Sequence, residues 1–281
     1  MNQVFNNPDL ERQFDIDGAV IVDLFPKEKL ADLQALLSKL REEGNRHAAN
    51  VDSSYKLSFF NSSPEYRKHV LEEVGAFFQP MVDVHLNGYE PLIINVFDKE
   101  PGTGEVPIHQ NWTFVDESKF TSVSVWIPLI DSSRENGTLE VVKGTHRVLT
   151  DYRSPSIPWV FENIREELKE RHLEPLEVKV GQAGIIDDSI IHWSSENDSE
   201  QVRTAIQLIM VPREATPIHY YGTGENDDYK LEVFKVDSDF FTRFDMHKKP
   251  EGVERIGFDS VRYHALTEEE MMDRIRKNIS N

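Results

Sequence analysis

From residue 90 onward the chain is a series of short runs rich in valine and isoleucine, each followed by turn-forming residues. The runs cover residues 92–97, 121–130, 139–142, 176–180, 183–186 and 204–211. Between them lie turn signals such as Pro101-Gly102-Thr103-Gly104 and Gly181-Gln182-Ala183-Gly184. Many short strands of β-branched residues at this spacing predict an antiparallel sandwich or jelly roll.

Helical signals lie on both sides of this strand-rich region. Residues 14–25 are expected to form a turn that leads into a short strand. Pro26 then opens a helix in which leucines recur at helical spacing, and Gly44 is a suitable end for it. Further helices are expected over residues 64–82, 159–171 and 267–275. The fold is therefore expected to be mainly β with flanking helices.

The chain shows no repeats, no low-complexity segment and no long linker. At 281 residues it is expected to be a single domain with a sizeable core. We expect an N-terminal helical and strand packing region at 1–89, a jelly-roll core at 90–221 and a C-terminal extension at 222–281.

Composition narrows the function classes. A formal charge of −19 disfavours nucleic acid and acidic membrane surfaces as partners, because phosphate contacts need clustered cations. The absence of cysteine excludes disulfides and thiolate metal sites. No apolar run approaches the roughly 18 residues of a membrane span. The first residues lack the basic start and apolar run of a signal peptide, so a cytoplasmic enzyme acting on a small molecule is expected.

Two histidines and an arginine lie in sequence contexts that suggest a site. His109 follows a Pro-Gly turn and a short strand, and His192 lies in an apolar strand. Two histidines on separate strands, with an oxygen ligand two residues after the first, form the facial triad of Fe(II) oxygenases. Here that oxygen position is Asn111. Arg203 begins a run that is otherwise apolar on one face, where a buried guanidinium needs an anion such as a carboxylate.

Several segments match a known family at its spacing. They are Phe14-x-x-x-Gly18-x-x-x-Val22, Asn95-x-Phe97, Lys99-Glu100-Pro101-Gly102, His109-Gln110-x-Trp112, Val125-Trp126-Ile127-Pro128-Leu129, Glu135-Asn136-Gly137-Thr138-Leu139, Lys143-Gly144-Thr145-His146 and His192-x-x-Ser195-x-Asn197-x-Ser199-x-x-x-Arg203. Over most of residues 10–212 the chain resembles the phytanoyl-CoA dioxygenase family of Fe(II)- and 2-oxoglutarate-dependent oxygenases.

The resemblance implies a double-stranded β-helix, a cupin-like jelly roll, with iron in its mouth. His109, Asn111 and His192 would be the metal ligands, and Arg203 would pair with the distal carboxylate of 2-oxoglutarate. Asn95 and Ser195 are weaker candidates for cofactor contacts; the alternative for each is a polar residue that satisfies the backbone. The implied activity oxidises or hydroxylates a small organic substrate and releases succinate and CO2.

Asn111 departs from the family pattern, which has aspartate at this position. It could serve as a working neutral ligand, or mark a halogenase-like variant in which chloride occupies the vacated position. It could also mark a weak or inactive member that binds 2-oxoglutarate or a metabolite as a sensor. Asp116 and Glu117 lie nearby in sequence, but their spacing from His109 does not fit, and a solvated loop is expected. A metabolite-binding jelly roll without iron leaves the paired motifs unexplained.

Overall fold

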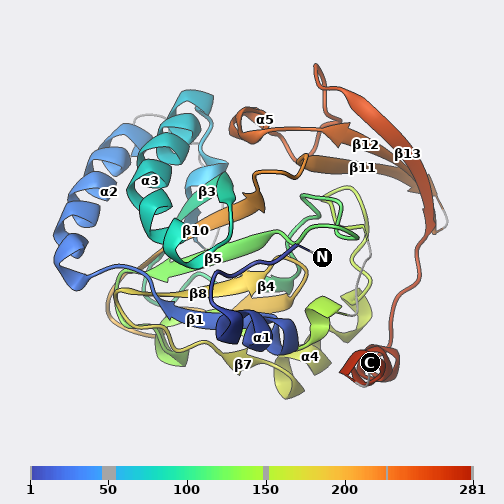
Figure 1. The fold of residues 1–281 in the computed structure, drawn as a ribbon, viewed down its shortest axis with the longest axis horizontal. Coiled ribbons are helices and arrows are strands. Elements are labelled where there is room, and N and C mark those ends of the chain that lie inside the picture. Colours follow the sequence, from blue (N-terminus) through green and yellow to red (C-terminus); the bar gives the residue numbers. More distant parts are fainter. Residues whose placement is uncertain (1, 46–54, 148–151, 226, 280–281) are drawn as a thin grey trace.

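The structure, a computed structural model, describes residues 2–45, 55–147, 152–225 and 227–279. Within these residues the largest antiparallel sheet has the strand order β1 (Ala19–Asp23), β8 (Gln182–Asp187), β5 (Val123–Pro128), β10 (Arg203–Pro212), β3 (Tyr89–Lys99) and β2 (Lys56–Leu57). A smaller sheet has the order β4 (Val106–His109), β9 (Ile191–Ser194), β6 (Glu140–Val142) and β7 (Glu174–Pro175). Successive strands pass between these sheets, so the predicted mainly β jelly roll with flanking helices is confirmed (Figure 1).

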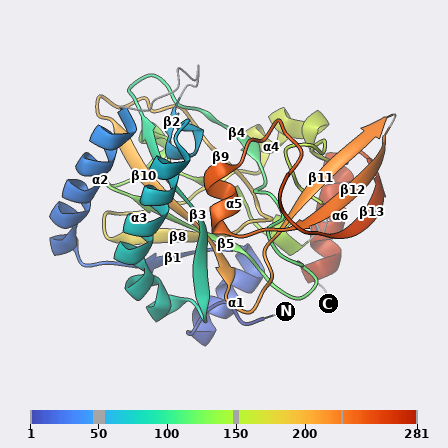
Figure 2. The ribbon, with the colours of Figure 1, turned by 90° about the horizontal axis from the view of Figure 1, so that it is seen from above.

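Two long helices cover the outer side of the large sheet (Figures 1 and 2). They are α2 (Leu30–Asn45) and α3 (Pro64–His85), which agree with the two predicted N-terminal helices. Ser63 caps α3 by accepting a hydrogen bond from the Tyr66 backbone N–H. Buried residues at helical spacing, Leu33, Leu37 and Leu40 in α2 and Val70, Val74 and Phe78 in α3, join the core against the sheet.

The first helix was not expected from the sequence. Residues 14–17, predicted as a turn, are the last turn of α1 (Pro8–Asp17). Asn7 caps this helix and Pro8 is its first residue, while Gly18 ends it with a left-handed φ of 73°. The termination signals were present, but α1 buries only Phe14, so it lacks the repeated apolar residues that mark a helix.

Two predicted elements after residue 150 differ from the structure. The strand predicted at 176–180 is wrong, because that backbone bonds to loops: the Ser132 N–H donates to the Val178 carbonyl, and the Leu176 N–H donates to the Leu139 carbonyl. The helical insert begins later than residue 159, with a short 3-10 turn, η5 (Glu162–Ile164), followed by α4 (Arg165–Arg171). Other 3-10 turns are η1 (Lys27–Lys29), η2 (Ser58–Phe60), η3 (Arg134–Asn136) and η4 (Thr145–Arg147).

The C-terminal part forms a third sheet to one side of the jelly roll (Figure 2). Its strands are β11 (Ile218–Glu225), β12 (Asp228–Lys235) and β13 (Arg255–Arg262), accompanied by α5 (Ser238–Arg243) and α6 (Glu268–Ile279). β11 crosses residue 221, where the sequence predicted the jelly-roll core to end. Phenylalanines of this part, including Phe241 and Phe244, pack with Phe114 in one apolar cluster.

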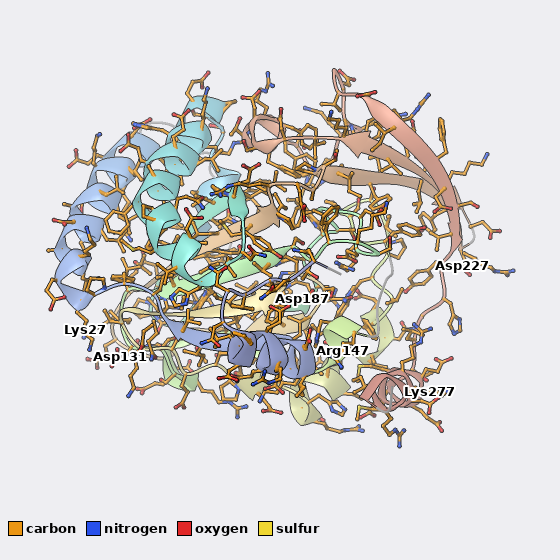
Figure 3. All side chains as sticks on the ribbon, viewed as in Figure 1. Lys27, Asp131, Arg147, Asp187, Asp227 and Lys277 are labelled. Atoms are coloured by element: carbon orange, nitrogen blue, oxygen red, sulfur yellow. The ribbon has the colours of Figure 1, made fainter. Side chains whose placement is uncertain are left out.

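Charged side chains differ in how far they are exposed. Lys27, Asp131 and Lys277 are exposed and lie at the periphery in Figure 3, whereas Asp187 is only partly exposed. None of the described helices is long and apolar enough to cross a membrane.

Candidate active site

A cavity of about 1070 Å³, including its open mouth, lies between the two sheets of the jelly roll. Its wall is mostly aromatic and aliphatic. Five residues predicted from the sequence line it: His109 from β4, Asn111 just after it, His192 from β9, Arg203 from β10 and Asn95 from β3. The fold therefore gathers in one space residues that lie far apart in the chain.

The two histidines face each other across one antiparallel strand pair. His109 is the ladder partner of His192, and their ring centroids lie 4.2 Å apart. The Nδ1 of His109 is 2.7 Å from the Pro107 carbonyl oxygen, and the Nδ1 of His192 is 2.9 Å from the Ile190 carbonyl oxygen. Because a carbonyl oxygen can only accept, each Nδ1 donates its proton and each Nε2 keeps a lone pair. This tautomer can bind a metal through Nε2.

Burial favours the neutral form of both imidazoles. It lowers the pKa of His109, although the Pro107 carbonyl and a contact with the Asn111 side chain oppose this effect. A nearby oxygen raises the pKa of an imidazole, so the direction of this effect indicates that the Asn111 oxygen faces the His109 ring. Burial, and then the proximity of His109, lower the pKa of His192 well below its usual value. A divalent metal would therefore meet two ligands that need not lose a proton.

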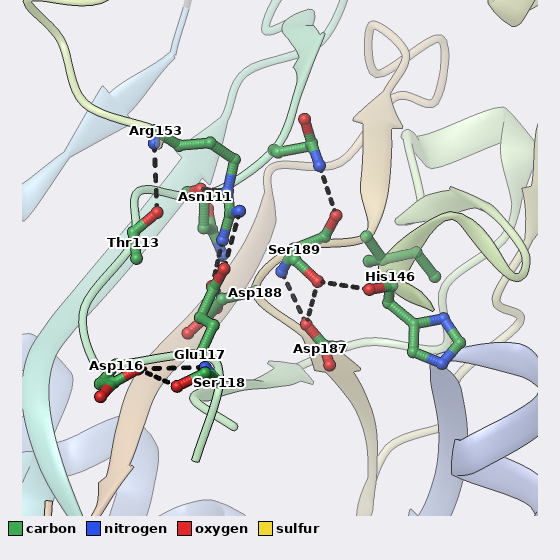
Figure 4. A network of polar contacts seen from close by, with 12 residues as sticks. Asn111, Thr113, Asp116, Glu117, Ser118, His146, Arg153, Asp187, Asp188 and Ser189 are labelled. Atoms are coloured by element: carbon green, nitrogen blue, oxygen red, sulfur yellow. Dashed lines mark hydrogen bonds and ion pairs between the residues drawn. The ribbon is translucent and has the colours of Figure 1, made fainter. Parts of the chain in front are cut away.

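A buried carboxylate holds the Asn111 amide. Asn111 Nδ2 donates to Asp188 Oδ1 at 2.7 Å and lies 3.0 Å from Ser124 Oγ. Ser124 Oγ donates its own proton to the same Asp188 oxygen at 2.7 Å. Figure 4 places both Asn111 and Asp188 in a network that also includes Arg153, whose Nε donates to the Asn111 carbonyl oxygen at 2.7 Å. Residue 111 is thus fixed through both its side chain and its backbone.

Asp188 lies in the turn between β8 and β9 with no exposed surface. It forms no ion pair with any residue that the structure describes, and its Oδ2 lacks a hydrogen-bond partner there. Burial raises the pKa of Asp188 to about 7, an effect that the side chains of Ser124, Asn111 and Ser122 partly offset. A buried carboxylate without an ion-pair partner is costly, and Arg153 interacts with Asp188 only electrostatically.

Hydrogen bonds continue from Asp188 along the wall to Asn95. Because Ser124 gives its proton to Asp188, it accepts from Gln207 Nε2 at 3.1 Å. Gln207 Oε1 in turn accepts from Asn95 Nδ2 at 3.0 Å. Asn95 Oδ1 is left buried without a partner in the described chain. The free group of Asn95 is therefore an acceptor, which suits a hydroxyl or amine better than a carboxylate.

Two buried cations form a second polar group. Arg203 is the ladder partner of Lys99, and the two residues are 2% and 0% exposed. Arg203 donates to the carbonyl oxygens of Asn136 and Gly137, and Lys99 donates to the hydroxyl and carbonyl of Ser194. Neither cation forms an ion pair within the described ranges. Like charges on facing strands repel, so this pair is costly unless an anion joins it.

The pKa values of Arg203 and Lys99 reflect the cost of burying the two side chains next to each other. Burial lowers the pKa of Arg203 to about 10. Burial, and then the neighbouring Arg203, lower the pKa of Lys99 to about 6. The Arg203 guanidinium also lies 5.5 Å from the ring centroid of Trp126, another cavity residue. Neutral groups, namely two backbone carbonyls and the Trp126 ring, hold the Arg203 guanidinium in place. Its positive charge suits an anionic ligand.

Ser195 is not brought to the cavity. Its hydroxyl bonds to the carbonyl oxygens of Arg134 and Glu196, whereas the preceding Ser194 lines the cavity. Because side chains alternate along a strand, Ser194 shares the face of His192 and Ser195 does not. The cofactor contact predicted for Ser195 is therefore wrong, and its alternative role, satisfying the backbone, is what the structure shows.

Asp116 and Glu117 do not line the cavity either. Asp116 accepts from the Ser118 hydroxyl (Figure 4). It also pairs with the exposed Lys119. Glu117 instead pairs with the buried Arg153 guanidinium, and its own side chain is only 16% exposed. The expected solvated loop is thus correct for Asp116 and wrong for Glu117.

Sequence reasoning missed several polar residues around the cavity. Gln207 lies four residues after Arg203 on the same face of β10, so strand alternation could have identified it. Lys99 directly precedes a Pro-Gly turn and was visible only as part of a matching segment. Ser124 and Asp188 meet Asn111 only through the tertiary fold, and no local pattern announces that contact.

The residues present fit a divalent metal and a dicarboxylate. In the described part of the chain no three histidine, cysteine, aspartate or glutamate side chains gather around a possible metal position. The available donors are two imidazole nitrogens and the Asn111 amide oxygen, a set suited to a first-row metal such as Fe(II). The Arg203 fork and the adjacent Lys99 suit a carboxylate of 2-oxoglutarate.

Curated proteins with similar sequences carry the same family name. The phytanoyl-CoA dioxygenase domain-containing protein 1 homolog of Dictyostelium discoideum is 30% identical over 145 residues, which cover 49% of this chain and 50% of that protein. Phytanoyl-CoA dioxygenase 1 of Oryza sativa subsp. japonica is 32% identical over 123 residues, covering 41% and 42%. The chain thus spans about half the length of these relatives, or less.

Solved structures of similar fold include enzymes crystallised with iron or 2-oxoglutarate. The α-ketoglutarate-dependent carbocyclase SnoK from nogalamycin biosynthesis has a TM-score of 0.54 and 16% identity, and the match covers 75% of this chain and 86% of that one. The epimerase SnoN, in complex with Fe3+, α-ketoglutarate and nogalamycin RO, has a TM-score of 0.53 and 17% identity over 74% and 86%. EctD from S. alaskensis, with 2-oxoglutarate and 5-hydroxyectoine, has a TM-score of 0.52 and 19% identity over 75% and 78%. Likeness at these identities establishes the shared fold.

A family profile decides the assignment. The profile described as phytanoyl-CoA dioxygenase (PhyH) matches residues 14–205, a range that holds His109, His192 and Arg203. It covers more than half of the chain and agrees with the segments quoted from the sequence. The chain therefore belongs to the phytanoyl-CoA dioxygenase family.

Proposed function

We propose that this chain is an Fe(II)- and 2-oxoglutarate-dependent oxygenase, which oxidises a small organic substrate and releases succinate and CO2. One observation carries the proposal: a single cavity holds two histidines whose Nδ1 atoms bond to backbone carbonyls and, separately, a buried Arg203 that forms no ion pair with a described residue. A metal satisfies the first group and the distal carboxylate of 2-oxoglutarate satisfies the second. Family membership supports the same activity.

The residues divide the work between holding the metal and orienting the cofactor. His109 and His192 would bind Fe(II) through Nε2, and Asn111 through its amide oxygen. Arg203 would grip the distal carboxylate of 2-oxoglutarate through its fork, with Trp126 packed against the guanidinium. When bound, Fe(II) and 2-oxoglutarate supply the activation of dioxygen needed to oxidise an unactivated carbon. The surrounding aromatic wall keeps water from the reacting groups.

The substrate class follows from the remaining wall. Aromatic and aliphatic side chains surround the rest of the cavity: Tyr55, Leu57, Phe59, Phe60, Phe97, Trp112, Phe114 and Met246. Such a wall favours an apolar, ring-bearing or branched molecule. The unpaired acceptor Asn95 Oδ1 favours a substrate that also carries a hydroxyl or amine.

The alternatives for Asn111 can be weighed by its surroundings. A halogenase-like site needs a vacated position that admits chloride, yet the Asn111 side chain fills this position. Its Nδ2 also lies 2.7 Å from the Asp188 carboxylate, which would repel a second anion. A neutral oxygen ligand therefore suits the local charge better than chloride does.

The proposal is tested by anaerobic titration of the purified protein with Fe(II) and 2-oxoglutarate. We expect a visible charge-transfer band that needs both additions, followed by succinate when oxygen is admitted. Omitting either Fe(II) or 2-oxoglutarate is the control and should give no band. A band without succinate, persisting across a panel of apolar hydroxylated substrates, would favour a sensor over an oxygenase. The absence of any band would remove the metal site and with it the proposed activity.

A further inference from the structure

The Asn111 amide lies between a carboxylate and an imidazole. Its Nδ2 is 2.7 Å from Asp188 Oδ1, and its side chain also contacts His109. Asp188 comes from the turn that leads into the strand of His192, so it reaches this position from a different part of the chain. The contact connects one proposed metal ligand to a group that is not itself a ligand.

Asp188 determines which end of the amide faces the metal position. Its Oδ1 accepts hydrogen bonds from both Asn111 Nδ2 and Ser124 Oγ. Ser124 Oγ, having donated its proton, can only accept from Asn111 Nδ2. Reversing the amide would place its oxygen against two acceptors. The amide oxygen of Asn111 therefore points away from Asp188 and toward His109 and His192.

The charge of Asp188 points to the same role. The carboxylate is completely buried and forms no ion pair within the described residues, although Arg153 interacts with it electrostatically. A divalent cation on the Asn111 oxygen would lie one amide group away and add a second positive charge to that of Arg153. In return, a carboxylate bonded to the NH2 group polarises the amide and places more negative charge on its oxygen. The amide then becomes a better metal ligand than an isolated asparagine.

We propose that Asp188 is a positioning residue of the metal site, which holds the Asn111 oxygen toward the metal and supplies the negative charge that the family's aspartate supplies directly. The site thus keeps a carboxylate, but this carboxylate acts on the metal through a hydrogen bond to Asn111 and does not bind it directly. This inference rests on the proposed function only in requiring that a metal binds at His109 and His192. It differs from the family pattern in assigning the carboxylate to residue 188.

The experiment measures Co(II) binding to the metal-free protein by calorimetry and by visible absorption, without 2-oxoglutarate or turnover. Asp188→Asn should weaken Co(II) binding on the order of 10- to 100-fold, the usual effect of removing a partner that orients a ligand. The double variant Asn111→Asp/Asp188→Asn exchanges the two groups and should bind Co(II) at least as tightly as the parent. Asp187→Asn is the matched control: this neighbouring carboxyl bonds to Ser189, and its substitution should leave Co(II) affinity unchanged.

The outcomes separate this inference from the proposed function. If the parent binds no Co(II), both fail. If the parent binds Co(II) and Asp188→Asn binds equally well, only the role of Asp188 fails. It also fails if the exchanged double variant remains as weak as Asp188→Asn, because the carboxylate would then be merely structural. Should Asp188→Asn not fold, the double variant decides alone: tight Co(II) binding supports the role, and weak binding or failure to fold overturns it.

Discussion

The two polar groups of the cavity have opposite charge deficits. Near His109 and His192 the buried carboxylate Asp188 forms no ion pair with a described residue, and Arg153 interacts with it only electrostatically. Near Lys99 the buried Arg203 guanidinium likewise forms no ion pair with a described residue. Each group is costly to bury by itself, and bonds to neutral partners offset only part of that cost. A ligand that places a cation near Asp188 and an anion near Arg203 would therefore complement both groups.

This difference shows why the cavity suits a metal chelate better than either component alone. A metal without a dicarboxylate leaves Arg203 without an ion pair, and a dicarboxylate without a metal leaves Asp188 without one. Binding of one component changes little at the other group directly, because different side chains respond. Each deficit can therefore be examined by substitution without removing the other.

The largest effect is expected at the cationic group. Arg203→Leu removes the fork, and we expect the affinity of the Mn(II)-loaded protein for 2-oxoglutarate to fall on the order of 100-fold, the effect of losing a buried charged partner. Affinity for Mn(II) alone should remain close to that of the parent. Titration calorimetry measures both. Arg203→Lys, which keeps the charge without the fork, should lie between the two. Unchanged 2-oxoglutarate affinity in Arg203→Leu would remove the proposed clamp.

Lys99 should make stability depend on pH. Unfolded lysine keeps its proton until pH is about 10, whereas the pKa of folded Lys99 is about 6. Between these values the unfolded chain binds the additional proton, so the free energy of unfolding rises with pH. Relative to Lys99→Met, the ligand-free parent should gain on the order of 1 kcal/mol per pH unit above pH 6. Below pH 6 the difference should level off.

Urea unfolding of both proteins at several pH values from 5 to about 8 tests this. The contribution of every other titrating group cancels in the difference between parent and variant. Saturating 2-oxoglutarate with Mn(II) should reduce the pH dependence, because its carboxylate restores a counter-charge and raises the pKa of Lys99. Parallel curves for the two proteins would show that Lys99 stays protonated in the fold.

The smallest effect distinguishes two adjacent serines. The Ser194 hydroxyl contacts Lys99 and lies 3.5 Å from Arg203 Nη2, whereas the Ser195 hydroxyl donates only to the carbonyl oxygens of Arg134 and Glu196. Ser194→Ala should weaken 2-oxoglutarate binding roughly fivefold, the value of about one hydrogen bond. Ser195→Ala should leave it unchanged. The same calorimetric titration compares them, and a larger effect at Ser195 would mean that the cationic group is oriented differently.

The fold could be predicted from the sequence mainly where strands bury one face. The β-branched runs gave β3, β5, β8 and β10. The strands β12 and β13 were missed because their side chains are largely exposed or half-buried and many are charged. The strand predicted at 176–180 failed for the opposite reason: its apolar residues are buried, but its backbone pairs with loops.

The site was predictable to the extent that its residues follow a strand or a family segment. His109, His192, Arg203 and Asn95 all line the cavity. Ser195 was predicted from segment spacing although strand alternation favours its neighbour. Asp188 was beyond sequence reasoning, because its contact with Asn111 depends on where the turn after β8 meets the segment after β4.

The pairing of His109 with His192 also ties the chemistry to the folding of the two strands. β4 and β9 are short, and their ladder is irregular between Val106 and His109, so few backbone bonds hold them together. A slip of one residue would turn one imidazole to the opposite face and separate the ligands. A bound metal would therefore stabilise the pairing of β4 with β9. It would also slow the exchange of the amide hydrogens in these two strands.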